Sequence, residues 1–98
     1  MGKNTTRIRL RVHGRVQGVG FRYFVEREAL RAGLCGWVRN LPDGSVEVEA
    51  DGERTLLAEF AAAVRRGPSL SRVTGVDDTW SETTSPHAAF RVRNDLDP

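Results

Sequence analysis

A glycine-rich stretch at residues 14–22 constrains this chain most, because it joins a strand-like pattern directly to a helical one. It reads Gly14-Arg15-Val16-Gln17-Gly18-Val19-Gly20-Phe21-Arg22. Such a loop can direct several backbone N–H groups towards one point. The N-terminal end of the next helix and the Arg22 guanidinium favour the same anion. The stretch therefore predicts a phosphate-sized anion site, although its composition alone is equally typical of a plain strand-to-helix turn.

The apolar residues recur with different periods in the segments before and after this stretch. Residues 6–13 alternate between apolar and charged side chains, which predicts a half-buried strand with a solvated outer face. Its apolar face carries Ile8, Leu10 and Val12, and its other face carries Arg7, Arg9 and Arg11. Residues 21–32 carry apolar side chains at helical spacing, with Leu30 off the stripe and Gly33 as the stop signal.

The remaining chain predicts five more elements, four strands and one helix. Leu34 to Asn40 and Ser45 to Ala50 form a hairpin around the turn Leu41-Pro42-Asp43-Gly44. Asp51-Gly52-Glu53 offers a cap for a second helix over Arg54 to Arg65, which Gly67-Pro68 ends. Val73 to Trp80 and Phe90 to Val92 are the last strands, separated by a polar loop from Ser81 to His87.

This order predicts an α+β, ferredoxin-like βαββαβ sandwich with a short fifth strand. We expect a mixed, mostly antiparallel sheet with two helices on one face. The first and third strands should be adjacent and parallel at its centre, with the arginine row facing Glu47 and Glu49 in exposed pairs. Residues 1–98 should form a single domain with flexible ends at 1–5 and 94–98.

Composition excludes several classes of function. The formal net charge is only +2 and both signs are interspersed, so nothing indicates nucleic-acid binding. A ferredoxin-like RNA binder would need stacking aromatic side chains on the sheet face that here carries Arg and Glu. Cys35 is the only cysteine and should be a buried thiol. No stretch has the length of a membrane span or the pattern of a signal peptide, so we expect a soluble, cytoplasmic protein. We also expect a monomer.

Two motifs carry a resemblance to a known family. The run from Gly14 to Arg22 resembles the phosphate-binding loop of acylphosphatases. Gly36-Trp37-Val38-Arg39-Asn40, followed by Asp43-Gly44-Ser45-Val46-Glu47, resembles the second signature of that family. The motifs have the right order and spacing, and the resemblance extends from about Ile8 to Val92, weakest after Arg72.

The resemblance implies hydrolysis of acyl phosphates to carboxylate and inorganic phosphate. It assigns phosphate binding to Arg22 and orientation of the attacking water to Asn40. The other phosphate ligands would be the backbone amides of Arg15, Val16, Gln17, Gly18, Val19, Gly20 and Phe21. Taken alone, Asn40 is equally typical of a hairpin end that satisfies its own backbone groups.

The residues themselves limit the chemistry in the same direction. No His, Cys or carboxylate set with metal-ligand spacing, no Ser-His pair and no carboxylate base stands near the loop. We therefore expect no metal or cofactor, and a substrate whose leaving group needs no proton. A carboxylate, with a conjugate-acid pKa of about 4, meets that need. The alternative is a non-catalytic anion-binding or regulatory module of the same fold, including a domain of a larger maturation enzyme.

Overall fold

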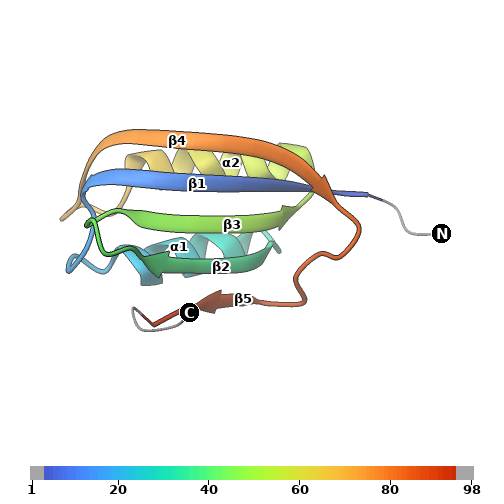
Figure 1. The fold of residues 1–98 in the computed structure, drawn as a ribbon, viewed down its shortest axis with the longest axis horizontal. Helices are drawn as coiled ribbons and strands as arrows, with labels where there is room; N and C mark the ends of the chain where they lie inside the picture. The colour runs from blue at the N-terminus through green and yellow to red at the C-terminus, as the bar shows by residue number, and fades with distance from the viewer. Residues whose placement is uncertain (1–3, 95–98) are drawn as a thin grey trace.

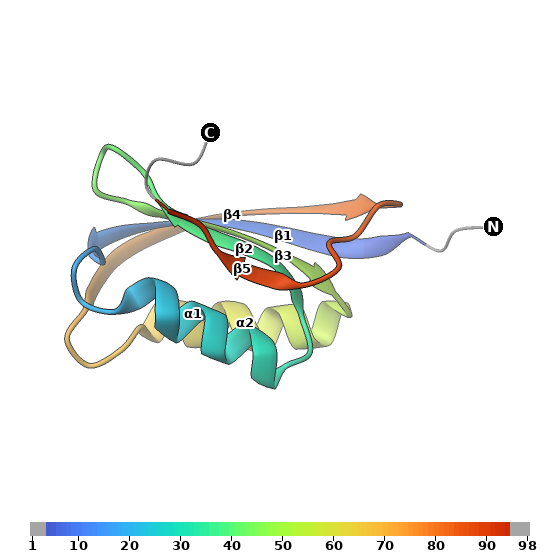
Figure 2. The same ribbon diagram turned by 90° about the horizontal axis from the view of Figure 1, so that it is seen from below.

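The structure, a computed structural model, describes residues 4–94, whose strands form one sheet in the order β4-β1-β3-β2-β5 (Figure 1). The elements are β1 (Thr5–Arg15), α1 (Phe21–Arg31), β2 (Cys35–Asn40), β3 (Val46–Gly52), α2 (Arg54–Arg66), β4 (Arg72–Thr83) and β5 (Phe90–Val92). Both helices cover one face of the sheet (Figure 2), and we call the opposite face the outer face. This is the ferredoxin-like α+β arrangement that the element order predicts.

The pairing of β1 with β3 corrects one prediction, because these central strands are antiparallel rather than parallel. Ile8 lies opposite Ala50, and Val12 lies opposite Val46. The crossover through α1 makes β1 and β2 run in the same direction. Because β3 follows β2 through a hairpin and lies between the two, it runs opposite to both. The parallel pairing is instead between β2 and β5.

The core lies between the sheet and the helices, where the apolar stripes were predicted to meet. Its buried side chains include the predicted apolar face Ile8, Leu10 and Val12, together with Val25, Val46, Val48, Leu57, Phe60 and Val64. Leu30, which falls off the stripe of α1, is 60% exposed. The two periods therefore assigned the faces of the strands and helices correctly.

The ends of the helices agree with the sequence at their C-termini but not at the start of α2. Gly33 and Gly67 follow the last turns of α1 and α2 with positive φ, as predicted. Asp51 and Gly52, predicted to cap α2, belong to β3 instead. The N-cap is Glu53, whose side chain makes no capping bond. Asp51 is not available as a cap because its carboxylate binds an arginine of β1.

The last third of the chain differs from its prediction mainly in length. β4 continues past Trp80 to Thr83 because it pairs with β1 along its whole course. β4 is an edge strand with little burial, which explains its weak alternation in the sequence. Thr5 pairs with Thr83, so β1 begins inside the end predicted to be flexible. The prediction of flexible ends also covers residues 1–3 and 95–98, which lie outside the described residues.

Cys35 starts β2 and is half-buried rather than fully buried. Within residues 4–94, no helix combines the length and the apolar character that crossing a membrane requires. β5 has the bounds that the sequence predicts, and it docks on β2 next to Trp37 and Val38.

Candidate active site

The loop between β1 and α1 is shorter than the predicted phosphate loop, because β1 continues to Arg15. A bulge between His13 and Gly14 carries the strand onwards, and Gly14 and Arg15 pair with Val73 and Arg72 of β4. The connecting segment is therefore residues 16–20. It lies at the same end of the molecule as the β2–β3 hairpin, as both ribbon views show (Figures 1 and 2).

Gly18 and Gly20 turn this loop into α1. Their φ angles are 74° and 76°, in the left-handed region that residues with a Cβ rarely adopt. A Cβ at either position would meet no atom within 4 Å. Backbone conformation rather than crowding therefore requires glycine at these positions. Because Gly20 directly precedes the first turn, the N-terminal end of α1 opens onto the loop.

The next feature of the site is the set of backbone amides in the loop. In the part of the chain that the structure describes, none of the N–H groups from Val16 to Phe21 donates a hydrogen bond. Backbone amides in native proteins are normally paired with protein groups, water or a ligand. A run of unpaired amides at a helix N-terminus is an arrangement that binds anions.

A pocket of about 170 Å³ lies where the loop, α1 and β2 meet. Its lining residues are Val16, Gly18, Gly20, Phe21, Arg22, Tyr23 and Asn40. The structure therefore brings Arg22 and Asn40 together from different elements, beside several residues of the predicted loop. Arg15, Gln17 and Val19, which were also predicted to bind phosphate, do not line this pocket.

Arg22 lies in the first turn of α1, and its orientation is set from the other end of the chain. Its Nη1 atom donates a hydrogen bond of 2.8 Å to the backbone oxygen of Arg93, just after β5. A guanidinium is planar and presents its donors in a fixed fork. Fixing one arm of that fork therefore fixes the direction of the whole group.

Asn40 ends β2 opposite Val46, and it separates two small pockets. Besides the pocket with Arg22, it lines one of about 170 Å³ with Gln17, Leu41 and Pro42. Among the described residues, the Asn40 side chain has no hydrogen-bond partner. A hairpin-end asparagine that satisfies its own backbone would have one, so the structure does not support that interpretation.

The Gln17 side chain ties the loop to the β2–β3 hairpin, a role that the sequence analysis missed. Its Nε2 atom donates to the backbone oxygens of Leu41 at 2.8 Å and Ser45 at 2.9 Å. These bonds hold the loop against the turn that follows Asn40. The sequence feature that could have indicated this role is the long amide side chain of Gln17 between apolar and glycine residues.

Tyr23 is a second lining residue that the sequence analysis missed. It follows Arg22 in α1, lines the same pocket and is 66% exposed. Val16 and Phe21, the other large apolar lining residues, are buried in the core. Tyr23 therefore forms the exposed part of the pocket wall. Its place off the apolar stripe of the helix could have indicated this.

The turn of the hairpin contains a carboxylate that is firmly ionised. Hydrogen bonds from the Ser45 side chain and backbone N–H, and then from Arg11, hold the pKa of Asp43 far below its ordinary value. Asp43 thus stays charged and bound within the turn. It is not poised to accept a proton from an attacking water.

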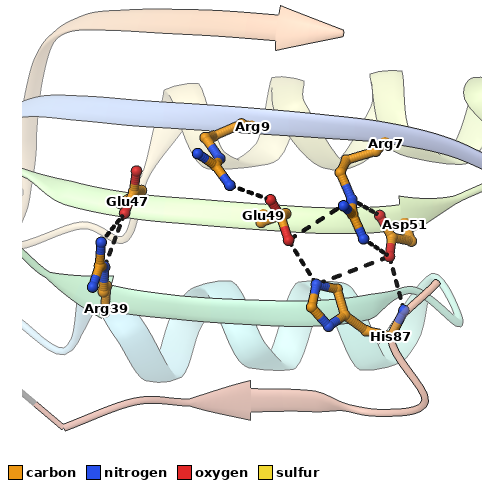
Figure 3. A network of polar contacts seen from close by, with 7 residues as sticks. All are labelled: Arg7, Arg9, Arg39, Glu47, Glu49, Asp51 and His87. Carbon is orange, nitrogen blue, oxygen red and sulfur yellow. Dashed lines mark hydrogen bonds and ion pairs between the residues drawn. The ribbon is translucent and has the colours of Figure 1, made fainter. Parts of the chain in front are cut away.

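A cluster of charged residues occupies the outer face, which Figure 3 views closely. We call Arg7, Arg9, Glu49, Asp51 and His87 the outer-face network. Arg7 donates to both oxygens of Asp51, at 2.7 and 2.9 Å. Glu49 binds Arg9 at 2.5 Å and the Nε2 atom of His87 at 2.6 Å. The backbone N–H of His87 donates to Asp51 at 2.9 Å.

This network corrects the prediction of exposed ion pairs on the outer face. The side chains of Glu49 and Asp51 are only 5% and 1% exposed. They are covered because the segment before β5 places His87 over them, in addition to the arginines of β1. Glu47 does not bind an arginine of β1; it pairs with Arg39 at 2.8 Å.

Burial and hydrogen bonding shift the pKa values of Glu49 and Asp51 in opposite directions. Burial disfavours the charged form of Glu49, but hydrogen bonds from His87 and Arg9 outweigh it and lower the pKa of Glu49. Burial likewise opposes ionisation of Asp51, and hydrogen bonds from Arg7 and the His87 backbone outweigh it and lower the pKa of Asp51. The hydrogen bond to Asp51 raises the pKa of Arg7. All three groups are therefore held in their charged forms.

Candidate metal ligands do not gather anywhere in residues 4–94. No group of three or more His, Cys, Asp or Glu side chains has the arrangement needed to hold an ion. Among the described residues, no acidic side chain lines the pocket of Arg22 and Asn40. The groups that line it are backbone amides, a guanidinium, a neutral amide and apolar side chains.

Comparisons with known proteins agree with this geometry. The acylphosphatase family profile matches residues 8–92. An acylphosphatase of Salinibacter ruber is 48% identical over 87 residues, which cover 89% of this chain and 92% of that protein. The crystal structure of acylphosphatase from Bacillus subtilis superposes with a TM-score of 0.87 and 44% identity, covering 90% of this chain and 98% of that one. Full-length HypF in its phosphate- and nucleotide-bound form matches with a TM-score of 0.82 and 27% identity, over 98% of this chain but 13% of that one.

Proposed function

The chain belongs to the acylphosphatase family, and we propose that it hydrolyses acyl phosphates in the pocket of Arg22 and Asn40. The observation that carries this proposal is that these two side chains line one pocket with Gly18 and Gly20. Relatives named acylphosphatase match over nearly their full length, as the 92% coverage of the Salinibacter protein illustrates. No observation favours the non-catalytic alternative.

The phosphoryl group of the substrate would be bound by the loop. The N–H groups of Val16 to Phe21 have no partner within residues 4–94 and can donate to phosphoryl oxygens. The guanidinium of Arg22 adds a charge-assisted pair of donors. These donors are in place before the reaction, so they stabilise the negative charge that builds up on the transferring group without reorganisation. Arg15 belongs to β1, so its amide is the least suited of the predicted ligands.

Asn40 would position the attacking water. Its side-chain carbonyl can accept a hydrogen bond from the water, and its NH₂ group can donate to a phosphoryl oxygen. The water oxygen then attacks phosphorus while the bond from phosphorus to the carboxyl oxygen breaks. The leaving carboxylate keeps the electron pair and needs no proton. The water's proton passes to an oxygen of the phosphoryl group, so no carboxylate base is required.

The acyl group would lie at the exposed part of the pocket, next to Tyr23. In-line displacement requires the leaving group to point away from the water, and therefore away from Asn40. The pocket is too small for much more than the phosphoryl group and its water. Tyr23 is the large apolar wall residue that is open to solvent. It can therefore contact an acyl chain or ring that extends out of the pocket.

Hydrolysis of acetyl phosphate in the presence of a chelator tests the proposal. We expect activity that survives exhaustive chelation, with competitive inhibition by inorganic phosphate, because protein donors supply the binding. The matched control is Arg22→Ala, measured at equal protein concentration. Absence of hydrolysis in both proteins would overturn the proposal. Activity that chelation removes and a divalent cation restores would overturn its metal-free form.

We further propose a cytoplasmic, monomeric protein that binds no nucleic acid. The single cysteine, half-buried at the start of β2, offers no disulfide within residues 4–94. The charged side chains of the outer face largely bind one another, which leaves few of them to contact a nucleic acid. Gel filtration tests the monomeric state, and a nucleic-acid retention assay at low salt tests the absence of nucleic-acid binding.

A further inference from the structure

The Gln17 side chain links the two segments that carry the proposed reacting groups. The loop of residues 16–20 would hold the phosphoryl group, and Asn40, at the end of β2, would hold the water. Gln17 Nε2 donates to the backbone oxygens of Leu41 at 2.8 Å and Ser45 at 2.9 Å. Among the described residues, every hydrogen bond between residues 16–20 and residues 41–45 comes from this side chain.

The turn of the hairpin keeps its shape without Gln17. The N–H of Leu41 donates to the oxygen of Ser45 at 2.9 Å, and the N–H of Gly44 donates to the oxygen of Leu41 at 3.1 Å. Asp43 accepts from the N–H of Ser45 at 2.9 Å and from Arg11 of β1. Both carbonyl oxygens that Gln17 contacts therefore retain a donor if its side chain is changed, and the turn stays attached to the sheet.

The loop of residues 16–20 has fewer contacts of its own. It is held at its two ends, where Val16 and Phe21 are buried in the core. Between them, no N–H group from Gln17 to Gly20 donates to an acceptor within residues 4–94. Gly18 and Gly20 add backbone freedom, because glycine restricts φ least. The side-chain amide of Gln17 therefore fixes where the loop lies relative to the hairpin.

The same amide has no donor left for the substrate. An NH₂ group carries two N–H donors, and two carbonyl oxygens accept from Gln17 Nε2. Gln17 does not line the pocket of Arg22 and Asn40. It lines the neighbouring pocket of about 170 Å³, which Asn40 also lines. Any effect of this side chain on the reaction must therefore act through the segments that it joins.

We propose that Gln17 is a positioning residue, which sets the separation between the phosphoryl group in the loop and the water at Asn40. This inference deepens the proposed function and rests on it. The two reacting groups lie on different segments, so their separation depends on how those segments are joined. A misplacement of about 1 Å between reacting groups can lower a rate by roughly a hundredfold.

Gln17→Met tests the proposal, because methionine has a similar length but donates no hydrogen bond. We expect kcat for acetyl phosphate to fall by about tenfold or more, because the loop is no longer held at its distance from Asn40. The dissociation constant of inorganic phosphate, measured by calorimetry, should stay within about threefold of wild type, because the loop amides and Arg22 are unchanged. A structural role alone would not separate these two quantities.

Ser71→Ala is the matched control, because it also removes a side-chain hydrogen bond to a backbone oxygen in a loop. Ser71 Oγ donates to the oxygen of Pro68 at 2.6 Å, and Ser71 lines neither of the two pockets that contain Asn40. Its kcat should equal that of wild type. Circular dichroism checks the folding of each variant. If Gln17→Met does not fold, Gln17→Asn takes its place, because it keeps the amide but shortens its reach.

A double variant shows whether Gln17 acts through the water at Asn40. In an Asn40→Ala background the water is no longer held, so its distance from the loop ceases to matter. Adding Gln17→Met to Asn40→Ala should therefore change kcat by less than about twofold. Two independent effects would instead multiply, and the double variant would lose about tenfold more than Asn40→Ala alone.

Three results would overturn the proposal. One is a kcat in Gln17→Met equal to that of Ser71→Ala. Another is a phosphate affinity that falls in parallel with kcat, which would mean that Gln17 supports phosphate binding only. The third is the full loss of kcat by Gln17→Met in the Asn40→Ala background. Each of these leaves acyl phosphate hydrolysis by the unaltered protein untouched, whereas failure of the proposed function would appear as absence of that hydrolysis.

Discussion

The pocket of Arg22 and Asn40 and the outer-face network both gather polar and charged groups, but they satisfy them differently. In the network, the buried oxygens of Glu49 and Asp51 receive hydrogen bonds from Arg7, Arg9 and His87. In the loop, the amides of Val16 to Phe21 have no acceptor within residues 4–94. Polar groups that are paired inside the protein stabilise it, whereas preorganised donors without a partner are ready for a ligand.

The comparison also separates two uses of arginine. Arg7 carries its counter-ion inside the fold, and its pKa is raised by the hydrogen bond to Asp51. Arg22 donates to the backbone oxygen of Arg93 at 2.8 Å, and it lines the candidate active pocket together with Asn40. A substitution should therefore affect mainly stability at Arg7 and mainly catalysis at Arg22.

The largest expected effect is that of Arg22→Ala. We expect kcat/KM for acetyl phosphate to fall by roughly 10²–10³-fold, as for other lost preorganised donors, and the inhibition constant for phosphate to rise. Arg22→Lys should recover little, because a point charge lacks the planar fork. Steady-state kinetics with circular dichroism as a folding control measure this. Wild-type phosphate affinity in Arg22→Ala would contradict the role of this residue.

The next effect is on stability, from Arg7→Ala in the network. Asp51, 1% exposed, would lose its charged partner, and the free energy of unfolding should drop by roughly 3 kcal/mol. The matched control is Arg11→Ala, which loses a solvent-exposed pair with Asp43 and a 3.3 Å hydrogen bond to the Ser45 hydroxyl, and should change stability little. Urea unfolding compares them. Equal losses of unfolding free energy in the two variants would mean that burial of the network does not matter. At low temperature, where both variants are folded, kcat should be near wild type in both.

Acid should weaken the network in a defined direction. The pKa values of Glu49 and Asp51 are lowered in the folded state, so the unfolded chain takes up protons first as pH falls. Stability should be full above about pH 5 and should decrease as pH drops through the ordinary carboxyl pKa near 4 towards the lowered values. Urea midpoints between pH 7 and pH 3 give this slope. It should be shallower in Asp51→Asn, and an unchanged slope would contradict the assignment.

The smallest effect is expected at the exposed wall of the active pocket. Tyr23→Ala should lower kcat/KM for benzoyl phosphate by a few fold, consistent with lost apolar contact of about 1 kcal/mol, and should affect acetyl phosphate less. Leu30→Ala, which removes an exposed apolar side chain of α1 away from the pocket, is the control. If both substrates lost activity equally in Tyr23→Ala, contact with the acyl group would not be the cause.

The sequence predicted what depends on local pattern. The alternation around Ile8, Leu10 and Val12 identified the core face, and the glycines at 18 and 20 identified the turn into α1. Period-two alternation is the same for either strand direction, but the predicted order of elements already requires β1 and β3 to be antiparallel, because a crossover joins β1 to β2 and a hairpin joins β2 to β3. The parallel prediction therefore misread that order. Arg22 was identified from its place after the loop as well as by resemblance, and Asn40 by resemblance; their shared pocket is visible only in the fold.

Other features depend on contacts between distant segments. The burial of Glu49 depends on His87, which no local pattern connects to β3. The contact of Arg22 with Arg93 likewise joins two ends of the chain. Gln17 was predicted for its amide, but its side-chain bonds to Leu41 and Ser45 only become visible once the loop and hairpin are placed together.

The central claim is that the loop and Arg22 hold the phosphoryl group while Asn40 acts on the water, and Asn40→Ala tests it most directly. We measure kcat for acetyl phosphate and the inhibition constant for inorganic phosphate in the same preparation. The claim predicts a fall in kcat of roughly two orders of magnitude with an inhibition constant near wild type. Asn40→Asp should do no better, because its carboxylate repels the phosphoryl oxygens. A variant that loses phosphate inhibition but turns over its bound substrate at the wild-type rate would contradict the claim.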